Sequence, residues 1–394
     1  MAVRLKREDS ADSLRDTVST DSEGSAPIHV EAASRALRHV MWTPALDRFG
    51  FVVAAGHASD APGPGANAVV QGEPRALSPG QARRENAKLH KWSTMLGVKW
   101  GGFSKGPRRL LLKRRVHNGV PDAIRGHVWA LLSDVERAAD RLPAFEHLFN
   151  KCPRRVVSEI FKDVERTFPE HELFLPANRR GGRDQAGGAA MLSRVLCAYA
   201  AYDPEVAYCQ GLNYLAAVFL MYAPQERAFL QLVALLEHSG LRALFLPGLP
   251  GAEEAFAVFD GLLGRFLPRL KAHLDAEGIP PSMYATRWFM TLFVGCLPFE
   301  ACARAMDVVL HDHDAKVAHR LGLAVLQAQE RRLLAASGCE LMEALRSAPR
   351  ACTNVDALFK RAYAIPLRRA HIEDLAQKHH RGLAPPEASA ATGR

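Results

Sequence analysis

Apolar side chains recur at intervals of three and four residues through most of the chain, which is the spacing that places them on one face of an amphipathic helix. The strongest stripe covers residues 212–220. Beyond it, Pro and Gly residues separate further predicted helices at 226–237, 252–267, 268–277, 288–292, 299–310, 315–335, 339–345, 355–362 and 367–380. No strand-like alternation of any length and no fixed-period repeat occurs. The pattern therefore predicts an all-α fold that is not a solenoid.

The helical pattern also divides the 394 residues into segments. Residues 1–80 are predicted to be a disordered and linker extension, since Ser, Ala, Pro and Gly dominate them. A short apolar island near 40–53 interrupts this extension and is predicted to dock on the main domain as a turn and a short extended piece. Residues 81–113 form a helical leader and a basic segment, residues 114–380 the main domain, and 381–394 a disordered tail.

One predicted helix carries an arginine on its polar side. Its apolar residues at helical spacing are predicted to face inward: Val157, Ile160, Phe161, Val164 and Phe168. Arg166 falls on the opposite, open side, in the last turn before Pro169. Asp163, three residues earlier, lies on the same side and can hold the guanidinium group. Taken alone, this pair is typical of an ordinary surface ion pair.

A glutamine stands at the start of the strongest apolar helix. Gln210 follows Tyr208 and Cys209 and precedes Gly211, which permits a close approach of the backbone. Taken alone, such a glutamine is typical of a polar helix end. An arginine that neutralises developing charge and a glutamine that orients water are, however, the two side chains that phosphoanhydride hydrolysis needs.

Composition limits the possible partners. The net charge of +9 is compatible with acidic partners such as phosphate groups, an anionic membrane or an acidic protein surface, but an ordinary solvated surface is the favoured explanation. The densest basic cluster is Lys105–Arg115, which can bind nucleic acid or anionic lipid, but a solvated run is favoured and an acidic partner surface comes next. The sequence shows no zinc-finger spacing, RNP aromatics or clear helix-turn-helix, so we predict no nucleic-acid binding.

The cysteines and the N-terminal residues bear on the redox environment and the targeting of the protein. Seven cysteines without a C-x-x-C pair are typical of a reduced, intracellular protein. The N-terminus lacks a signal peptide, and the longest apolar run, 214–223, is too short to cross a bilayer.

The glycine- and arginine-rich loop 178–188 lacks the P-loop pattern. The run His311–Asp314 suggests a metal site, but a structural or solvent-facing role is favoured, and no cofactor or metal is predicted.

With these residues in place, the sequence resembles the TBC-domain family of Rab GTPase-activating proteins over about residues 114–380. Three blocks carry the likeness in the family's order: Arg115-x-x-x-Gly119-Val120-Pro121-x-x-x-Arg125-Gly126-x-x-Trp129, Ile160-x-x-Asp163-x-x-Arg166-Thr167-Phe168-Pro169 and Tyr208-Cys209-Gln210-Gly211-x-Asn213. Residues 47–51 and 91–95 also resemble leader segments found in part of the family. Ala207 and Leu212 depart from the family's usual glycine and methionine, which bears on the choice of partner.

The resemblance implies a two-lobed helical domain that is not itself an enzyme. It implies that Arg166 and Gln210 act as arginine and glutamine fingers, inserted in trans into a GTP-bound Rab-family GTPase. It further implies supporting roles for Asp163, Tyr208, Arg125, Trp129 and Asn213, although spacing alone favours a structural brace for Arg125 and Trp129. GTP and Mg²⁺ would belong to the partner. A role in vesicle trafficking and a cytoplasmic location, at most peripheral on endomembranes, are expected; the alternative is a Rab-binding scaffold with little activity.

Overall fold

The computed structural model describes residues 47–51, 79–97, 100, 108–174 and 187–383. Within these ranges the regular elements are helices, and the β-pairing is one isolated bridge between Phe51 and His171. The predicted all-α class is therefore confirmed. None of the described helices is both long and apolar enough to cross a membrane.

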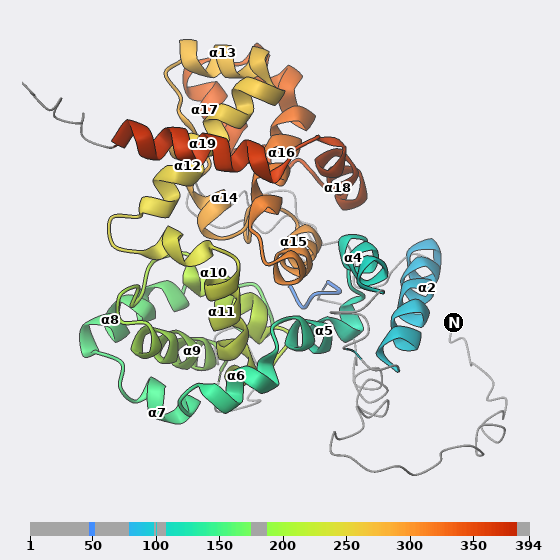
Figure 1. The fold of residues 1–394 in the computed structure, drawn as a ribbon, viewed down its shortest axis with the longest axis vertical. Helices are drawn as coiled ribbons and strands as arrows, with labels where there is room; N and C mark the ends of the chain where they lie inside the picture. The colour runs from blue at the N-terminus through green and yellow to red at the C-terminus, as the bar shows by residue number, and fades with distance from the viewer. Residues whose placement is uncertain (1–46, 52–78, 98–99, 101–107, 175–186, 384–394) are drawn as a thin grey trace, which may run out of the picture.

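The helices form two lobes (Figure 1). The first lobe holds α5 (Arg125–Leu132), α6 (Val135–Arg141), α7 (Phe145–Phe149), α8 (Arg154–Val164), α9 (Gly188–Tyr202), α10 (Leu212–Leu220) and α11 (Gln225–His238). The second holds α12 (Pro250–Phe266), α13 (Pro268–Ala276), α14 (Thr286–Met290), α15 (Phe299–Asp312), α16 (Lys316–Ala335), α17 (Gly338–Ser347), α18 (Val355–Ala364) and α19 (Arg369–Leu383). Short 3₁₀ turns occur at Asp122–Ile124, Leu241–Phe245 and Pro281–Met283. The pattern of apolar residues did not reveal α6 and α7, which are only seven and five residues long.

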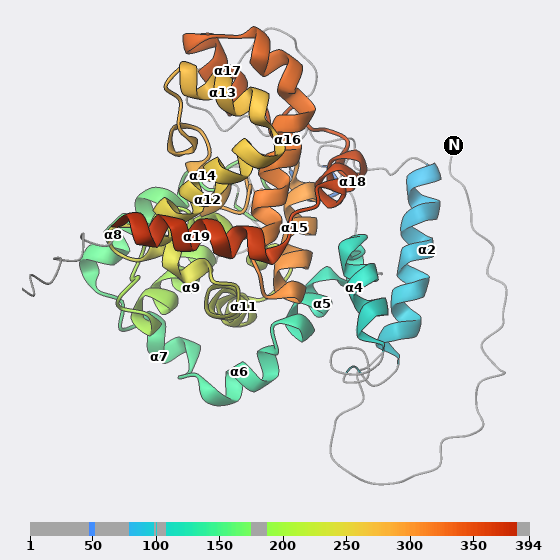
Figure 2. The same ribbon diagram turned by 45° about the horizontal axis from the view of Figure 1, so that its top comes forward.

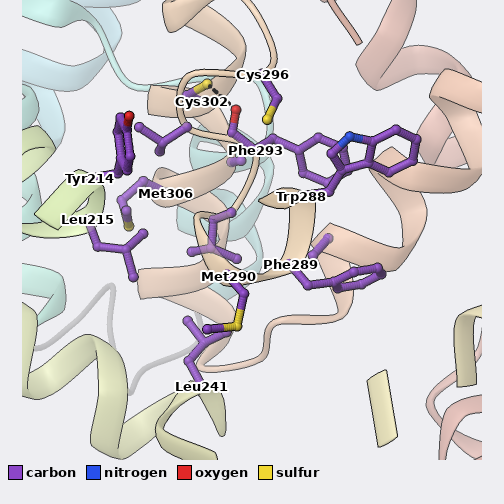
Figure 3. Packing of buried hydrophobic residues seen from close by; sticks show 14 of the residues in the cluster. Tyr214, Leu215, Leu241, Trp288, Phe289, Met290, Phe293, Cys296, Cys302 and Met306 are labelled. Atoms are coloured by element: carbon purple, nitrogen blue, oxygen red, sulfur yellow. Dashed lines mark hydrogen bonds between the residues drawn. The ribbon is translucent and has the colours of Figure 1, made fainter. Parts of the chain in front are cut away.

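The lobes share one continuous hydrophobic core, and α10 lies within it. Figure 3 shows Tyr214 and Leu215 of α10 beside Met306 of α15, with Met290 and Leu241 packed below them. Every residue of α10 is buried, which explains its strong apolar stripe. The start of α10, two residues after Gln210, is therefore anchored at the junction of the two lobes.

The apolar island docks on the domain as predicted, as far as residues 47–51 show; its remaining residues lie outside the described ranges. Phe51 is 2% exposed, and its ring centroid lies 5.6 Å from that of Phe168 and 5.3 Å from that of Phe299. Arg48 pairs with Glu300. The segment thus covers the backbone just after Arg166.

The leader helices α2 (Pro79–Leu96) and α4 (Arg109–His117) have a small core of their own. Trp92 and Met95 of α2 pack against Leu112 and Val116 of α4, together with the start of the main domain. Figures 1 and 2 both show α2 alongside α4 at the edge of the molecule. Trp92 therefore packs on a core, as the sequence predicted.

Two predictions for α8 were wrong. Val157 and Phe161 do not face inward: they are 41% and 57% exposed. Ile160, Val164 and Phe168 are buried as predicted, and Val156 and Asp163 complete the buried face. Both stripes repeat every four residues, so periodicity alone could not choose between them, and packing against α9 selected the second. The helix also ends at Val164, so Arg166 lies in the following turn rather than in the last helical turn.

Candidate functional site

Arg166 lies in the turn after α8, which we call the arginine turn (residues 165–168). Its side chain is 56% exposed, and it pairs with Asp163, whose side chain is only 8% exposed. The spacing predicted that Asp163 lies on the open side with Arg166. This prediction is wrong, because Asp163 is buried. The second carboxylate oxygen of Asp163 accepts a hydrogen bond of 2.6 Å from the Tyr208 hydroxyl. A buried carboxylate thus holds the base of the guanidinium group while most of the side chain reaches solvent.

A second chain of hydrogen bonds ties the arginine turn to residues 207–211, which we call the glutamine turn. The Thr167 hydroxyl donates to the Asp163 carbonyl oxygen at 2.6 Å and accepts from Asn213 Nδ2 at 2.7 Å. Asn213 Oδ1 in turn accepts from the Gly211 N–H at 3.0 Å. Because Thr167 and Asn213 are each 1% exposed, water does not compete for these bonds. The two turns are therefore positioned by one buried network.

The glutamine turn holds Gln210 on the surface. Gly211 has a φ of +118°, and an added Cβ would lie 2.9 Å from the Met290 carbonyl oxygen. Any other residue there would be strained and would push the turn away from the second lobe. Gln210 itself is exposed, and α10 begins two residues later. The prediction that Gln210 precedes the first turn of a buried helix is confirmed.

Two titratable groups of the glutamine turn, Tyr208 and Cys209, have raised pKa values and stay neutral near pH 7. Burial and the hydrogen bond to Asp163 raise the pKa of Tyr208 well above its ordinary value. Burial, with a smaller contribution from Asp163, raises the pKa of the Cys209 thiol. Neither group can serve as a proton shuttle or a thiolate nucleophile. The exposed polar side chains that the two turns present to a partner are those of Glu165, Arg166 and Gln210.

Thr167 was not singled out from the sequence, although the polar Asn213 at the head of an apolar helix was a usable signal. Thr167→Val keeps the shape but leaves the Asn213 amide without its buried acceptor, which costs about 1–3 kcal/mol. We expect a loss of this size in the free energy of unfolding, measured by urea denaturation. The exposed Thr94, whose hydroxyl bonds to the His90 carbonyl of its own helix, is the control: Thr94→Val should change stability little.

Arg125 and Trp129 belong to a different cluster, built around the fully buried Asp307 of α15. Arg125 Nε lies 3.2 Å and Trp129 Nε1 2.7 Å from Asp307 Oδ1, and the Val120 N–H lies 2.8 Å from Oδ2. The ring beneath the Arg125 guanidinium is Tyr222, at 5.5 Å, rather than the indole that the helical spacing suggested. This cluster ties the start of α5 to the second lobe and makes no hydrogen bond with Arg166 or Asp163 that the structure shows.

Removing the carboxylate at the centre of this cluster is expected to be costly. Asp307→Asn leaves the buried Arg125 with a weakened counter-charge, and breaking such a buried pair costs about 3–5 kcal/mol. The measurement is urea unfolding followed by circular dichroism. Asp356 is the matched control, because it also pairs with an arginine, Arg304, but is 76% exposed. Asp356→Asn should cost less than about 1 kcal/mol; an equal loss in both variants would contradict the assignment.

Among the described residues, His117, His311 and Asp312 form a group with possible metal-ligating atoms within 4.8 Å of one another. His117 Nε2 lies 3.0 Å and His311 Nδ1 2.7 Å from the Asp312 carboxylate. Burial alone would raise the pKa of Asp312, but hydrogen bonds from both imidazoles hold it well below its usual range. Lys113 Nζ stands 4.0 Å from the same carboxylate. These contacts satisfy the Asp312 carboxylate and link α4 to α15. His311 and Asp312 are the last two residues of α15, whereas the sequence placed them between helices.

Comparison with known proteins agrees with this architecture. The model of the Rab-GTPase-TBC domain family matches residues 122–334. Rab GTPase-activating protein tbc-11 of Caenorhabditis elegans is 34% identical over 269 residues, which cover 66% of this chain and 27% of that protein. TBC1 domain family member 10B of Homo sapiens is 33% identical over 66% of this chain and 32% of that protein. The chain therefore matches only about a third of the length of these relatives.

Solved structures show the same fold. The RabGAP TBC domain of a Chlamydomonas flagellar protein superposes with a TM-score of 0.56 at 25% identity, covering 73% of this chain and 96% of that one. The Ypt/Rab-GAP domain of Gyp1p gives a TM-score of 0.57 at 16% identity, over 75% of this chain and 99% of that one. Together with the family match, these likenesses place the chain in the Rab-GTPase-TBC domain family, which confirms the resemblance seen in the sequence.

Proposed function

We propose that the protein accelerates GTP hydrolysis by a Rab-family small GTPase, and that Arg166 and Gln210 are the residues it supplies in trans. The observation that carries the proposal is that two exposed, chemically suited side chains stand on turns that one buried network holds together. Membership of the family and the name of the relative tbc-11 support this activity.

The chemistry of each group follows from its charge and position. The Arg166 guanidinium would neutralise charge that develops on the transferred phosphoryl oxygens, and Gln210 would orient the attacking water. Asp163, held by Tyr208, would keep the guanidinium in its orientation, and Asn213 would fix the glutamine turn. GTP and Mg²⁺ would arrive with the partner, so this chain needs to bind neither by itself.

The test is single-turnover GTP hydrolysis by a panel of GTP-loaded Rab proteins, with and without the full chain. An arginine supplied in trans increases the rate by about 10³–10⁵, and we expect at least one Rab to respond on that scale. Binding to GTP-loaded Rab proteins without any increase in rate would instead indicate a Rab-binding scaffold. Absence of both binding and stimulation across the panel would sink the proposal.

Next to the arginine turn, α8 offers an apolar surface that a partner can cover. Val157 and Phe161 are one helical turn apart and both exposed, whereas large apolar side chains on the rest of α8 are buried. A Rab that places its nucleotide at Arg166 would have to pass beside them. These two residues are therefore the proposed apolar contact of the complex.

Phe161→Ser is expected to raise the KM for the GTPase about 10- to 100-fold, because covering a Phe side chain is worth about 1.5–3 kcal/mol. The maximal rate should be unchanged, since Phe161 does not contact the reacting atoms in this proposal. Stability should also be unchanged, because the side chain is exposed in the free protein. Met283, 51% exposed in the second lobe, provides the control, and Met283→Ser should leave KM as it was. A fall in the maximal rate of Phe161→Ser would contradict this role.

A further inference from the structure

The basic excess of this protein is concentrated in one place. Residues 79–118 contain eleven lysines and arginines and one glutamate, a formal charge of +10. Since the whole chain carries +9, the other 354 residues together carry −1. The charge is therefore not a mild excess spread over the surface. It belongs to α2, α4 and the residues around them, which we call the basic unit (residues 79–118).

Most of this charge faces solvent. Nine of the basic residues lie in the described part of the unit: Arg83, Arg84, Lys88, Lys91, Arg108, Arg109, Lys113, Arg114 and Arg115. Two of them lie near acidic residues: Lys88 Nζ is 3.7 Å from Glu85, and Lys113 Nζ is 4.0 Å from Asp312 of α15. Arg109 and Arg114 are exposed on α4. The described part of the unit thus presents a large cationic surface.

The same helix exposes apolar side chains among its arginines. Leu110 and Leu111 of α4 are 69% and 37% exposed, whereas Leu112 and Val116 on the opposite face are 2% and 0% exposed. The small core of the unit is complete without the two outer leucines. Exposed leucines on a cationic helix are the combination that lets a helix lie in the interface of an anionic bilayer, with the basic heads at the phosphates.

We propose that the outer face of α4, flanked by the cationic side chains of α2, binds the surface of an anionic lipid bilayer. The basic side chains supply attraction to the headgroups, at about 1 kcal/mol for each residue close to the surface. Leu110 and Leu111 enter the boundary between headgroups and acyl chains. A single-stranded nucleic acid fits less well, because its bases stack on aromatic rings, whereas the large apolar side chains that α4 exposes are Leu110 and Leu111. The inference does not depend on the proposed GTPase activity.

The test is sedimentation of the full chain with vesicles of phosphatidylcholine that contain about one part in three of phosphatidylserine, the anionic lipid of the cytoplasmic leaflet. Vesicles of phosphatidylcholine alone are the reference. Arg109→Glu/Arg114→Glu should reduce binding to the anionic vesicles at least about tenfold, since four charge units are lost at the contact. Leu110→Ser/Leu111→Ser keeps the charge and should reduce binding several-fold. Both variants should stimulate GTP hydrolysis in solution as the unmodified chain does.

A matched control distinguishes binding by this local surface from an effect of the total charge of the protein. Arg331 of α16 and Arg346 of α17 are exposed, and Arg331→Glu/Arg346→Glu changes the net charge by the same amount. This control should bind anionic vesicles nearly as well as the unmodified chain. The proposal is overturned by an absence of binding to anionic vesicles, by equal loss in both charge-reversed variants, or by unchanged binding of the leucine variant. Preferential binding of the basic unit to duplex or single-stranded nucleic acid over vesicles would overturn it as well. Circular dichroism confirms that each variant is folded.

Discussion

Arg166→Ala is expected to reduce the stimulated rate of GTP hydrolysis by about 10³–10⁵, which returns the GTPase to its intrinsic rate. The reason is that no other exposed cation is held by Asp163 and Tyr208 at the arginine turn among the described residues. Arg166→Lys keeps the charge but loses the planar fork that bonds two oxygens at once, so we expect only partial recovery. The measurement is single-turnover hydrolysis at saturating activator.

The control for this experiment is an ion pair of the same design elsewhere. Arg137 is 64% exposed and pairs with Asp134, three residues earlier, at 3.5 Å. Arg137→Ala removes an equivalent surface pair and should leave the stimulated rate unchanged. Binding of GTP-loaded Rab by Arg166→Ala should persist, because the apolar contact at Val157 and Phe161 remains. If the alanine variant stimulated hydrolysis as well as the unmodified chain, Arg166 would have no catalytic part.

Gln210→Ala should reduce the stimulated rate by about a hundredfold or more, the usual effect of removing one preorganised polar group from a transition-state site. Stability should not change, because the Gln210 side chain is exposed and the glutamine turn is fixed by Gly211 and Asn213 instead. The measurement is again single-turnover hydrolysis, combined with thermal unfolding of the variant.

The partner's own glutamine decides how this result is interpreted. If Gln210 orients the attacking water, a Rab whose active-site glutamine is replaced by alanine should still be stimulated by the unmodified chain. The same Rab should not respond to Gln210→Ala. Full loss of stimulation with the substituted Rab and the unmodified chain would assign the water to the GTPase, and Gln210 would then only contribute to binding.

Much of the fold could be predicted from local pattern. The long helices from α9 to α19 follow from apolar spacing, and their breaks follow from Pro and Gly. The short helices α6 and α7 were not predicted, because five to seven residues hold few turns of a period, although the equally short α14 was predicted at 288–292 and lies at Thr286–Met290. The buried face of α8 was also predicted wrongly in part, since two stripes of equal spacing compete and only the position of α9 separates them.

The candidate site divides in the same manner. Arg166, Asp163, Tyr208 and Gln210 could be named from sequence blocks, because their residue types suit the chemistry and their order matches a family. The hydrogen bonds that link these elements could not be predicted from the sequence. Thr167 bonds to Asn213 46 residues away, and Asp307 bonds to Trp129 178 residues away. Contacts between such distant positions leave no periodic trace in the chain.

By itself, therefore, the sequence determined the all-α class, the family and the identity of the two exposed candidate side chains. Those features depend on local periodicity and on residue type. The tertiary structure alone decided that Asp163 is buried beneath Arg166, that Thr167 and Asn213 join the two turns, and that Phe161 faces solvent. These depend on which helix faces meet, and that is settled by the packing of the whole core rather than by any one segment.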